Sequence, residues 1–167
     1  MASSAPAVQP LVLRQRGLKG PMSADGPLEL ALTAEERTRL RGQRHTRCGR
    51  KLLLQLPRGG VLEPGEWLGA TAEVPLVQVQ AAPEALIQVR SPDPLALLQA
   101  AYHLGNRHVA MEIHCAELRL LDDPVLAHLL EHRGLQVGHL HAPFQPETGA
   151  YGLASPHQHS PHSSHDH

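Results

Sequence analysis

Two segments in the second half of the chain follow the same pattern, about 30 residues apart. Each has an apolar run, then Asp-Pro, then leucines at helical spacing, then a glycine and a second apolar run. Asp93-Pro94 and Asp123-Pro124 are typical helix starts, because aspartate caps the first amides and proline suits the first turn. Two successive strand–helix–strand units predict a four-stranded antiparallel sheet with both helices on one face. We therefore expect a ferredoxin-like βαββαβ domain over residues 83–145.

Glycines are expected to end both helices. Each follows an apolar stripe: Leu97, Leu98, Ala101 and Leu104 before Gly105, and Leu126, Leu129 and Leu130 before Gly134. The residue just past a helix often adopts the left-handed conformation, which favours glycine. We expect Gly105 to take this left-handed position and Gly134 to close the second helix.

The first half of the chain carries short strand signals separated by turns. The segments KLLLQL (51–56) and EVPLVQVQ (73–80) are strand candidates, and Pro64-Gly65 fits a tight turn. TAEE (33–36) matches a capping box and predicts a short helix. We expect a small β domain over residues 28–82 that binds a partner or a peptide. A loose segment, residues 1–27, precedes it and contains one candidate strand at residues 11–13. The fold class is α+β.

Composition limits the partners of the chain. Fifteen Lys and Arg residues against 16 Asp and Glu give a formal net charge of −1, which favours neither nucleic acid nor an anionic membrane surface. No segment approaches the roughly 18 apolar residues of a membrane span, and the N-terminus lacks the features of a signal peptide. The two cysteines are too few for a disulfide framework. We expect a cytoplasmic protein with no nucleic-acid or membrane partner.

Histidine is the unusual resource of this sequence. Of its 13 histidines, five lie among the last twelve residues: His157, His159, His162, His165 and His167. Neutral imidazole is a good ligand for nickel, copper and zinc, and a spacing of two or three residues lets neighbouring rings converge on one ion. We expect residues 146–167 to be a disordered tail that binds metal. The alternative is a solvated tail whose histidines have no function.

The segment HLGNRH (103–108) is the second place where a metal ligand is expected. In HVAMEIH (108–114), alternation puts Val109, Met111 and Ile113 on one face, and His108, Glu112 and His114 on the other. If the helices cover the first face, His108 and His114 are exposed. Two interpretations of His108 remain open from spacing alone: a metal ligand, or a cap at the helix C-terminus, where a protonated ring meets the helix dipole favourably.

Other residue pairs give weaker signals. His45 with Cys48, and His114 with Cys115, each offer two metal ligands, but neither has a second pair at zinc-finger spacing. Free thiols and surface histidines are the preferred interpretation of both. The sequence contains no phosphate-binding loop, no nucleophile elbow and no paired-histidine zinc-protease helix. We therefore expect a binding protein rather than an enzyme.

Several segments resemble one known family, the UreE urease accessory proteins, which are nickel metallochaperones. The resemblance is carried by AAYHLGNRHVAMEI (100–113), DDPVLAHLLEHRGL (122–135) and APFQPETGAYG (142–152) followed by a His-rich end. LTAEERTRLR (32–41) and KLLLQLPRGGVLEPGEWL (51–68) resemble the N-terminal β domain of that family. The resemblance covers about residues 28–167, and the Gly-Asn-Arg-His motif is its most specific element.

The resemblance implies a homodimer with a metal site at the dimer interface, where the ligand of the family falls on His108. It also implies delivery of Ni2+ to apo-urease through the GTPase and scaffold proteins of the maturation system. Where some relatives carry further histidines, this chain has LLDDP (120–124), which does not support an auxiliary site there.

The expected metal ligands are His108 and the five tail histidines, with His114 as a secondary candidate, and Zn2+ or Cu2+ as other ions that these ligands accept. The alternatives are a nickel, zinc or copper storage protein on the same scaffold, and a peptide-binding module with an incidental tail.

Overall fold

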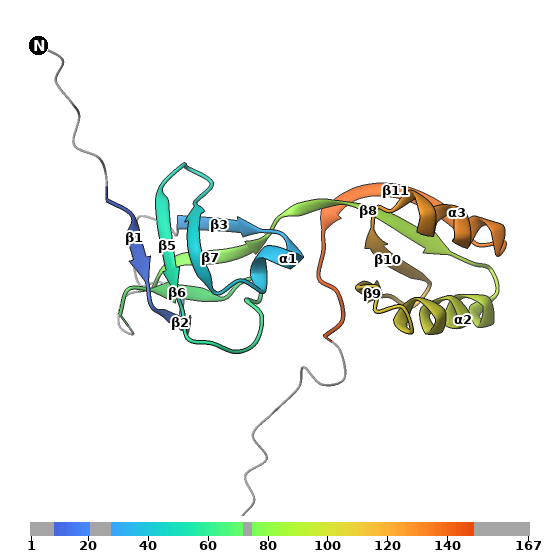
Figure 1. Cartoon of the computed structure of the whole chain (residues 1–167), viewed down its shortest axis with the longest axis horizontal. Helices are drawn as coiled ribbons and strands as arrows, with labels where there is room; N and C mark the ends of the chain where they lie inside the picture. Colours follow the sequence, from blue (N-terminus) through green and yellow to red (C-terminus); the bar gives the residue numbers. More distant parts are fainter. Residues whose placement is uncertain (1–8, 21–27, 72–74, 149–167) are drawn as a thin grey trace, which may run out of the picture.

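The computed structural model describes residues 9–20, 28–71 and 75–148. Within them the chain is a mixed α+β protein with three helices and two groups of strands (Figure 1), as the sequence predicted. The predicted tail histidines lie outside the described residues.

The N-terminal half consists of two small sheets. One has the order β1-β5-β4, with β1 at Leu11–Leu13, β5 at Lys51–Gln55 and β4 at Arg41–His45. The other has the order β2-β6-β7-β3, with β2 at Gln15–Leu18, β6 at Trp67–Gly69, β7 at Pro75–Ala81 and β3 at Leu28–Leu32. The pairs β1–β5 and β3–β7 are parallel, and the others are antiparallel.

Leucine and valine fill the core of this half, in keeping with the low aromatic content of the chain. Both sheets contribute fully buried side chains to one cluster, among them Leu13, Leu52 and Leu54 from the first and Leu30, Leu68 and Val77 from the second. The inner faces of the two sheets therefore share one apolar core.

The local signals of the first half are confirmed. Helix α1 (Ala34–Arg37) begins with a reciprocal capping box, in which Thr33 Oγ1 accepts from Glu36 N at 3.2 Å and Glu36 Oε2 accepts from Thr33 N at 3.0 Å. The turn at Pro64-Gly65 is closed by a bond from Glu66 N to Glu63 O at 3.0 Å, with Gly65 at a φ of +88°. A non-glycine residue at such a φ would be strained, which explains why glycine stands there.

The second half has the element order β8 (Pro83–Arg90), α2 (Pro94–Gly105), β9 (Met111–Ile113), β10 (Glu117–Leu121), α3 (Pro124–His132) and β11 (Gln136–Pro143). The strand order is β11-β8-β10-β9, and every neighbouring pair is antiparallel. Asp93 and Asp123 cap the two helices as predicted, accepting from Leu95 N at 2.9 Å and Val125 N at 2.8 Å.

Both helices cover the same face of this sheet. Their buried residues form one cluster with side chains of the sheet: Leu97, Ala100, Leu104, Ala127 and Leu130 pack with Ile87, Val89, Met111, Leu118 and Leu120. Among the described residues, no helix covers the opposite face of the sheet. This open face and the ends of the helices carry the side chains described next.

The prediction that Gly105 is the left-handed residue after the first helix was wrong. Gly105 is the last residue of α2, and its φ lies outside the left-handed region. Asn106 and Arg107 continue in a right-handed turn, bonded to Tyr102 O and Leu104 O at 3.0 Å each. The chain reverses at His108 instead, with a φ of +57°. After α3, Gly134 does close the helix, with a φ of +82°.

Candidate metal centre

His108 lies at an exposed corner between α2 and β9. It is the single non-glycine residue with a positive φ among the described residues. Histidine tolerates this region better than most side chains, although glycine is still preferred there. The prediction that His108 begins the next strand was wrong, because β9 starts only at Met111.

The two interpretations of His108 can be compared with its hydrogen bonds. Its backbone N–H donates to Gly105 O at 2.9 Å, so the end of α2 is capped by the main chain. Its ring forms no hydrogen bond or ion pair with any residue in the described part of the chain. The helix end therefore does not need the imidazole, which is available to a ligand.

The two faces of β9 are buried differently from the prediction. Glu112 pairs with Arg119, and Met111 with Leu120, so the alternation itself holds. However, Ile113 is 54% exposed, whereas Glu112 is only 8% exposed. The segment after β11 covers Glu112: its carboxylate Oε1 accepts from Gln145 N at 2.6 Å. No local sequence pattern predicts this contact, because the two residues lie 33 positions apart.

The same segment is fixed a second time to β9. Glu147 N donates to Met111 O at 2.8 Å, next to the bond between Gln145 and Glu112. The last described residue is Thr148, so the chain leaves this part of the structure beside β9. Met111 is three positions from His108. The start of the predicted tail therefore lies close to the histidine corner.

His114, the secondary candidate, also contacts Glu112. Its Nε2 lies 3.0 Å from Glu112 Oε2, and 43% of its side chain is exposed. No group of three or more His, Cys, Asp or Glu residues capable of holding a metal ion occurs within the described ranges. The described part of one chain therefore does not bring His108, His114 and a third ligand together.

Glu117 forms the most strongly bonded carboxylate of the open sheet face, and the sequence did not predict it. Burial opposes its ionisation, but hydrogen bonds from Gln88, Arg90 and Arg119 outweigh burial and lower the pKa of Glu117 to about 2. These bonds are 2.6 to 2.8 Å long. Because its oxygens are already engaged by cationic and amide donors, Glu117 holds β8 and β10 together rather than binding metal.

The cysteines do not form a metal cluster within the described residues. Both are exposed free thiols, as expected. Cys48 Sγ lies 3.1 Å from Thr46 Oγ1, and this bond, with a backbone bond at Arg50, lowers the pKa of Cys48 below its ordinary value. A lowered pKa favours the reactive thiolate.

The outer face of α2 carries an apolar stripe. Leu95, Leu98 and Tyr102 are 59%, 67% and 67% exposed, and their spacing puts them on one side of the helix. The stripe runs toward the corner that holds His108. Large exposed apolar side chains grouped in this way are typical of a contact surface.

None of the helices in the described part is long and apolar enough to cross a membrane.

Comparison with known proteins agrees with the resemblance seen in the sequence. Residues 22–82 match the family described as "UreE urease accessory protein, N-terminal domain", and residues 84–167 match "UreE urease accessory protein, C-terminal domain". The chain is 55% identical over 149 residues to the urease accessory protein UreE of Parasynechococcus marenigrum, covering 89% of this chain and 96% of the relative. It is 52% identical over 152 residues to that of a Synechococcus species, covering 89% and 87%. It is 46% identical over 142 residues to that of Nitrosococcus oceani, covering 85% and 84%.

Proposed function

Because this chain belongs to the UreE family of urease accessory proteins, we propose that it carries Ni2+ and delivers it for assembly of the urease active site. The observation that carries this proposal is His108, an exposed imidazole at a left-handed corner whose ring no described residue engages. In this proposal the chain acts in the cytoplasm with the GTPase and scaffold proteins of the maturation system and with apo-urease. Residues 28–82 are the partner-binding domain in this proposal.

The metal site is completed by a second copy of the chain. A two-fold contact pairs each surface patch with itself, so it brings two His108 rings to one ion. The stripe of Leu95, Leu98 and Tyr102 supports such a contact, because it offers apolar area on the helix that ends next to His108. The dimer is then held by apolar packing and does not depend on the metal.

The tail histidines supply the remaining ligands. His157 lies ten positions after Glu147, which is bonded to Met111, and an extended chain of that length spans at most roughly 35 Å. His108 lies three residues from Met111, or at most roughly 11 Å along the chain. The chain between Glu147 and the tail histidines is therefore long enough for His157 and the later histidines to bind the same ion as His108. His114 is a secondary ligand, since Glu112 already engages its ring.

Imidazole ligands do not select nickel by affinity alone. A nitrogen site generally holds Cu2+ more tightly than Ni2+ and can also take Zn2+. Selection of Ni2+ then comes from the availability of the ion and from the partner that receives it. A storage role on the same scaffold differs from this proposal in needing no urease partner.

The variant His108→Asn tests the site. Asparagine also tolerates a positive φ, so the corner keeps its conformation while the imidazole is removed. We expect loss of the single tightest ion per dimer and of most urease activation, with an unchanged dimer mass and weak tail binding retained. His128→Asn is the matched control, because His128 is also exposed but lies on α3.

Calorimetry with Ni2+, mass measurement in solution and activation of apo-urease give the readouts. If His108→Asn keeps a tight site at one ion per two chains, the bridging role of His108 is wrong. A chain that ends at Gly152 should bind fewer ions and keep its fold, because the sequence of the removed segment has almost no apolar side chains. Full urease activation by a chain that lacks both His108 and the tail would favour an interaction module instead.

A further inference from the structure

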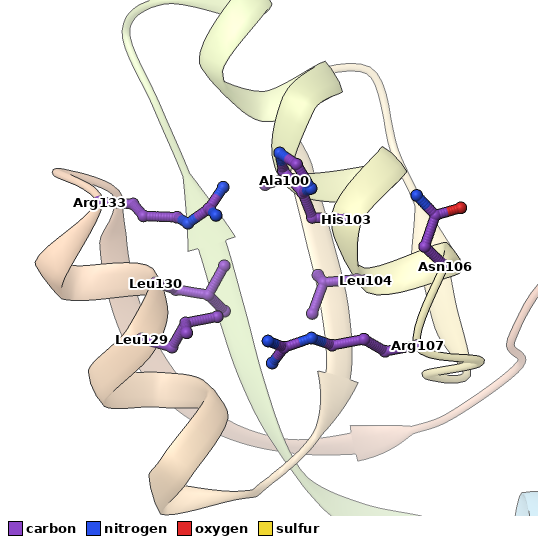
Figure 2. Close-up of a pocket in the computed structure, with 8 residues that line it drawn as sticks. All are labelled: Ala100, His103, Leu104, Asn106, Arg107, Leu129, Leu130 and Arg133. Atoms are coloured by element: carbon purple, nitrogen blue, oxygen red, sulfur yellow. The ribbon is translucent and has the colours of Figure 1, made fainter.

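A hollow between α2 and α3 has the chemistry of a docking site and plays no part in the metal proposal. Its volume is about 160 Å³. Leu104, Leu129 and Leu130 form its apolar surface, and Arg107, Arg133 and His103 stand around it (Figure 2). Pockets for drug-sized ligands are typically about 300 to 1,000 Å³, so this hollow has room for one or two side chains rather than for a cofactor.

Two arginines converge on the hollow from opposite sides. Figure 2 shows the guanidinium group of Arg133, at the end of α3, and that of Arg107, just after α2, both reaching toward the space between the helices. Arg90 and Arg119 elsewhere in this half are paired with Glu117. In contrast, neither Arg107 nor Arg133 forms a side-chain hydrogen bond or ion pair with a residue in the described ranges.

Like charges that face each other above an apolar surface repel, and an anion between them would remove the repulsion. A cation near a helix C-terminus is favourable by itself, which accounts for one charge at each helix end. The dipole does not account for both side chains turning toward the same leucine-lined space. Guanidinium groups bind carboxylates with two parallel hydrogen bonds, and a neighbouring aliphatic side chain can occupy the apolar surface.

We propose that this hollow, from here on called the groove between α2 and α3, binds an acidic peptide segment of a partner protein. Arg107 and Arg133 hold a carboxylate of the peptide, and a leucine-like side chain packs against Leu104 and Leu129. The occupant is a peptide because the groove combines two positive groups with an apolar surface in a small volume. It lies on the side of α2 that faces α3, whereas Leu98 and Tyr102 are exposed on the outer face. A second copy of the chain on the outer stripe would leave the groove open.

The test uses the full chain, labelled with ¹⁵N, in a buffer with a chelator so that no metal ion links protein and peptide. The probes are short capped peptides that combine glutamate and leucine in different orders. Matched peptides carry glutamine for glutamate or serine for leucine. Titrations followed by NMR are expected to shift the amide signals of Leu104, Arg107, Leu129 and Arg133. Each of the two matched changes should weaken binding.

The substitutions Arg107→Gln and Arg133→Gln should each lower the affinity for the peptide by about tenfold or more, as expected for loss of a hydrogen bond to a charged group. Arg58→Gln makes the same change of charge at an exposed position of the N-terminal half and should leave affinity unchanged. The NMR spectrum of each variant checks that it is folded.

Absence of binding by every glutamate–leucine peptide overturns the proposal. So does equal affinity of the doubly substituted chain, Arg107→Gln with Arg133→Gln, and of Arg58→Gln. A change of mass in solution for the doubly substituted chain would assign the groove to contact between copies, which also contradicts it. None of these results depends on nickel binding, so failure here is distinct from failure of the proposed function.

Discussion

The carboxylate of Glu112 is expected to fix the segment that leads into the tail. Gln145 N donates to it at 2.6 Å in a place where Glu112 is only 8% exposed. A hydrogen bond to a charged group contributes about 1.5–3 kcal/mol, and the exposed contact with His114 adds less than about 1 kcal/mol. Glu112→Ala should therefore lower the free energy of unfolding by about 2–4 kcal/mol. Arg119, the residue opposite Glu112 on β10, keeps its bonds to Glu117 in this variant and is not left unpaired.

Hydrogen exchange of single amides and urea unfolding measure this effect. In Glu112→Ala the amides of Gln145 and Glu147 should exchange faster than in the wild type, because the segment detaches from β9. Glu112→Gln keeps an oxygen acceptor without the charge, so its loss of stability should be about 0.5–1.5 kcal/mol. Glu131→Ala, at an exposed position of α3, is the control and should change stability by less than about 0.5 kcal/mol.

Two results would contradict this role of Glu112: equally fast exchange of the Gln145 amide in the wild type and in Glu112→Ala, and equal stability of Glu112→Ala and Glu131→Ala. Either outcome would mean that the segment after β11 is held by something other than this carboxylate.

Glu117, Cys48 and the glycines near the two helix ends can each be tested by substitution. Because the pKa of Glu117 is lowered from 4.5 to about 2, this residue stabilises the fold fully above pH 4.5, and its contribution is lost as pH falls toward 2. In urea unfolding at a series of acidic pH values, Glu117→Gln should lose less stability over this range than the wild type. Because Thr46 lowers the pKa of Cys48, alkylation of this thiol should be half-maximal below pH 9.0, and Thr46→Val should move the midpoint upward. In thermal or urea unfolding, Gly134→Ala should destabilise the chain by about 1–2 kcal/mol, because φ is +82° at this position. Gly105→Ala should be neutral or stabilising by up to about 1 kcal/mol. The reason is that Gly105 is helical and that a methyl group there would meet no atom within 4 Å.

Features set by neighbours in the chain could be predicted from the sequence. The caps at Asp93 and Asp123 and the box at Thr33 depend on residues two or three positions away, and all three are confirmed. Gly105 shows the limit of this reasoning. A glycine after an apolar helical stripe is typical of a left-handed cap. Here the backbone hydrogen bonds of Asn106 and Arg107 extend the right-handed turn beyond Gly105.

Contacts between distant segments could not be predicted. The parallel pairs β1–β5 and β3–β7 join strands far apart in the sequence, and no local pattern encodes which strands meet. The same holds for Glu112: alternation gave its face, but its burial depends on Gln145. For the candidate site, sequence reasoning identified His108 as exposed but placed it at the start of a strand instead of at the left-handed corner.

The left-handed backbone at His108 has a consequence for how such sequences would diverge. A position with a φ of +57° favours glycine or asparagine on conformational grounds, so mutation without selection would tend to replace the imidazole. A lineage that stopped using the ring should drift toward those residues at this corner while keeping Gly134 after α3, where the backbone alone requires glycine. We therefore expect histidine at 108 to be kept where its side chain is used, and glycine or asparagine at this corner to mark a chain that no longer uses the ring.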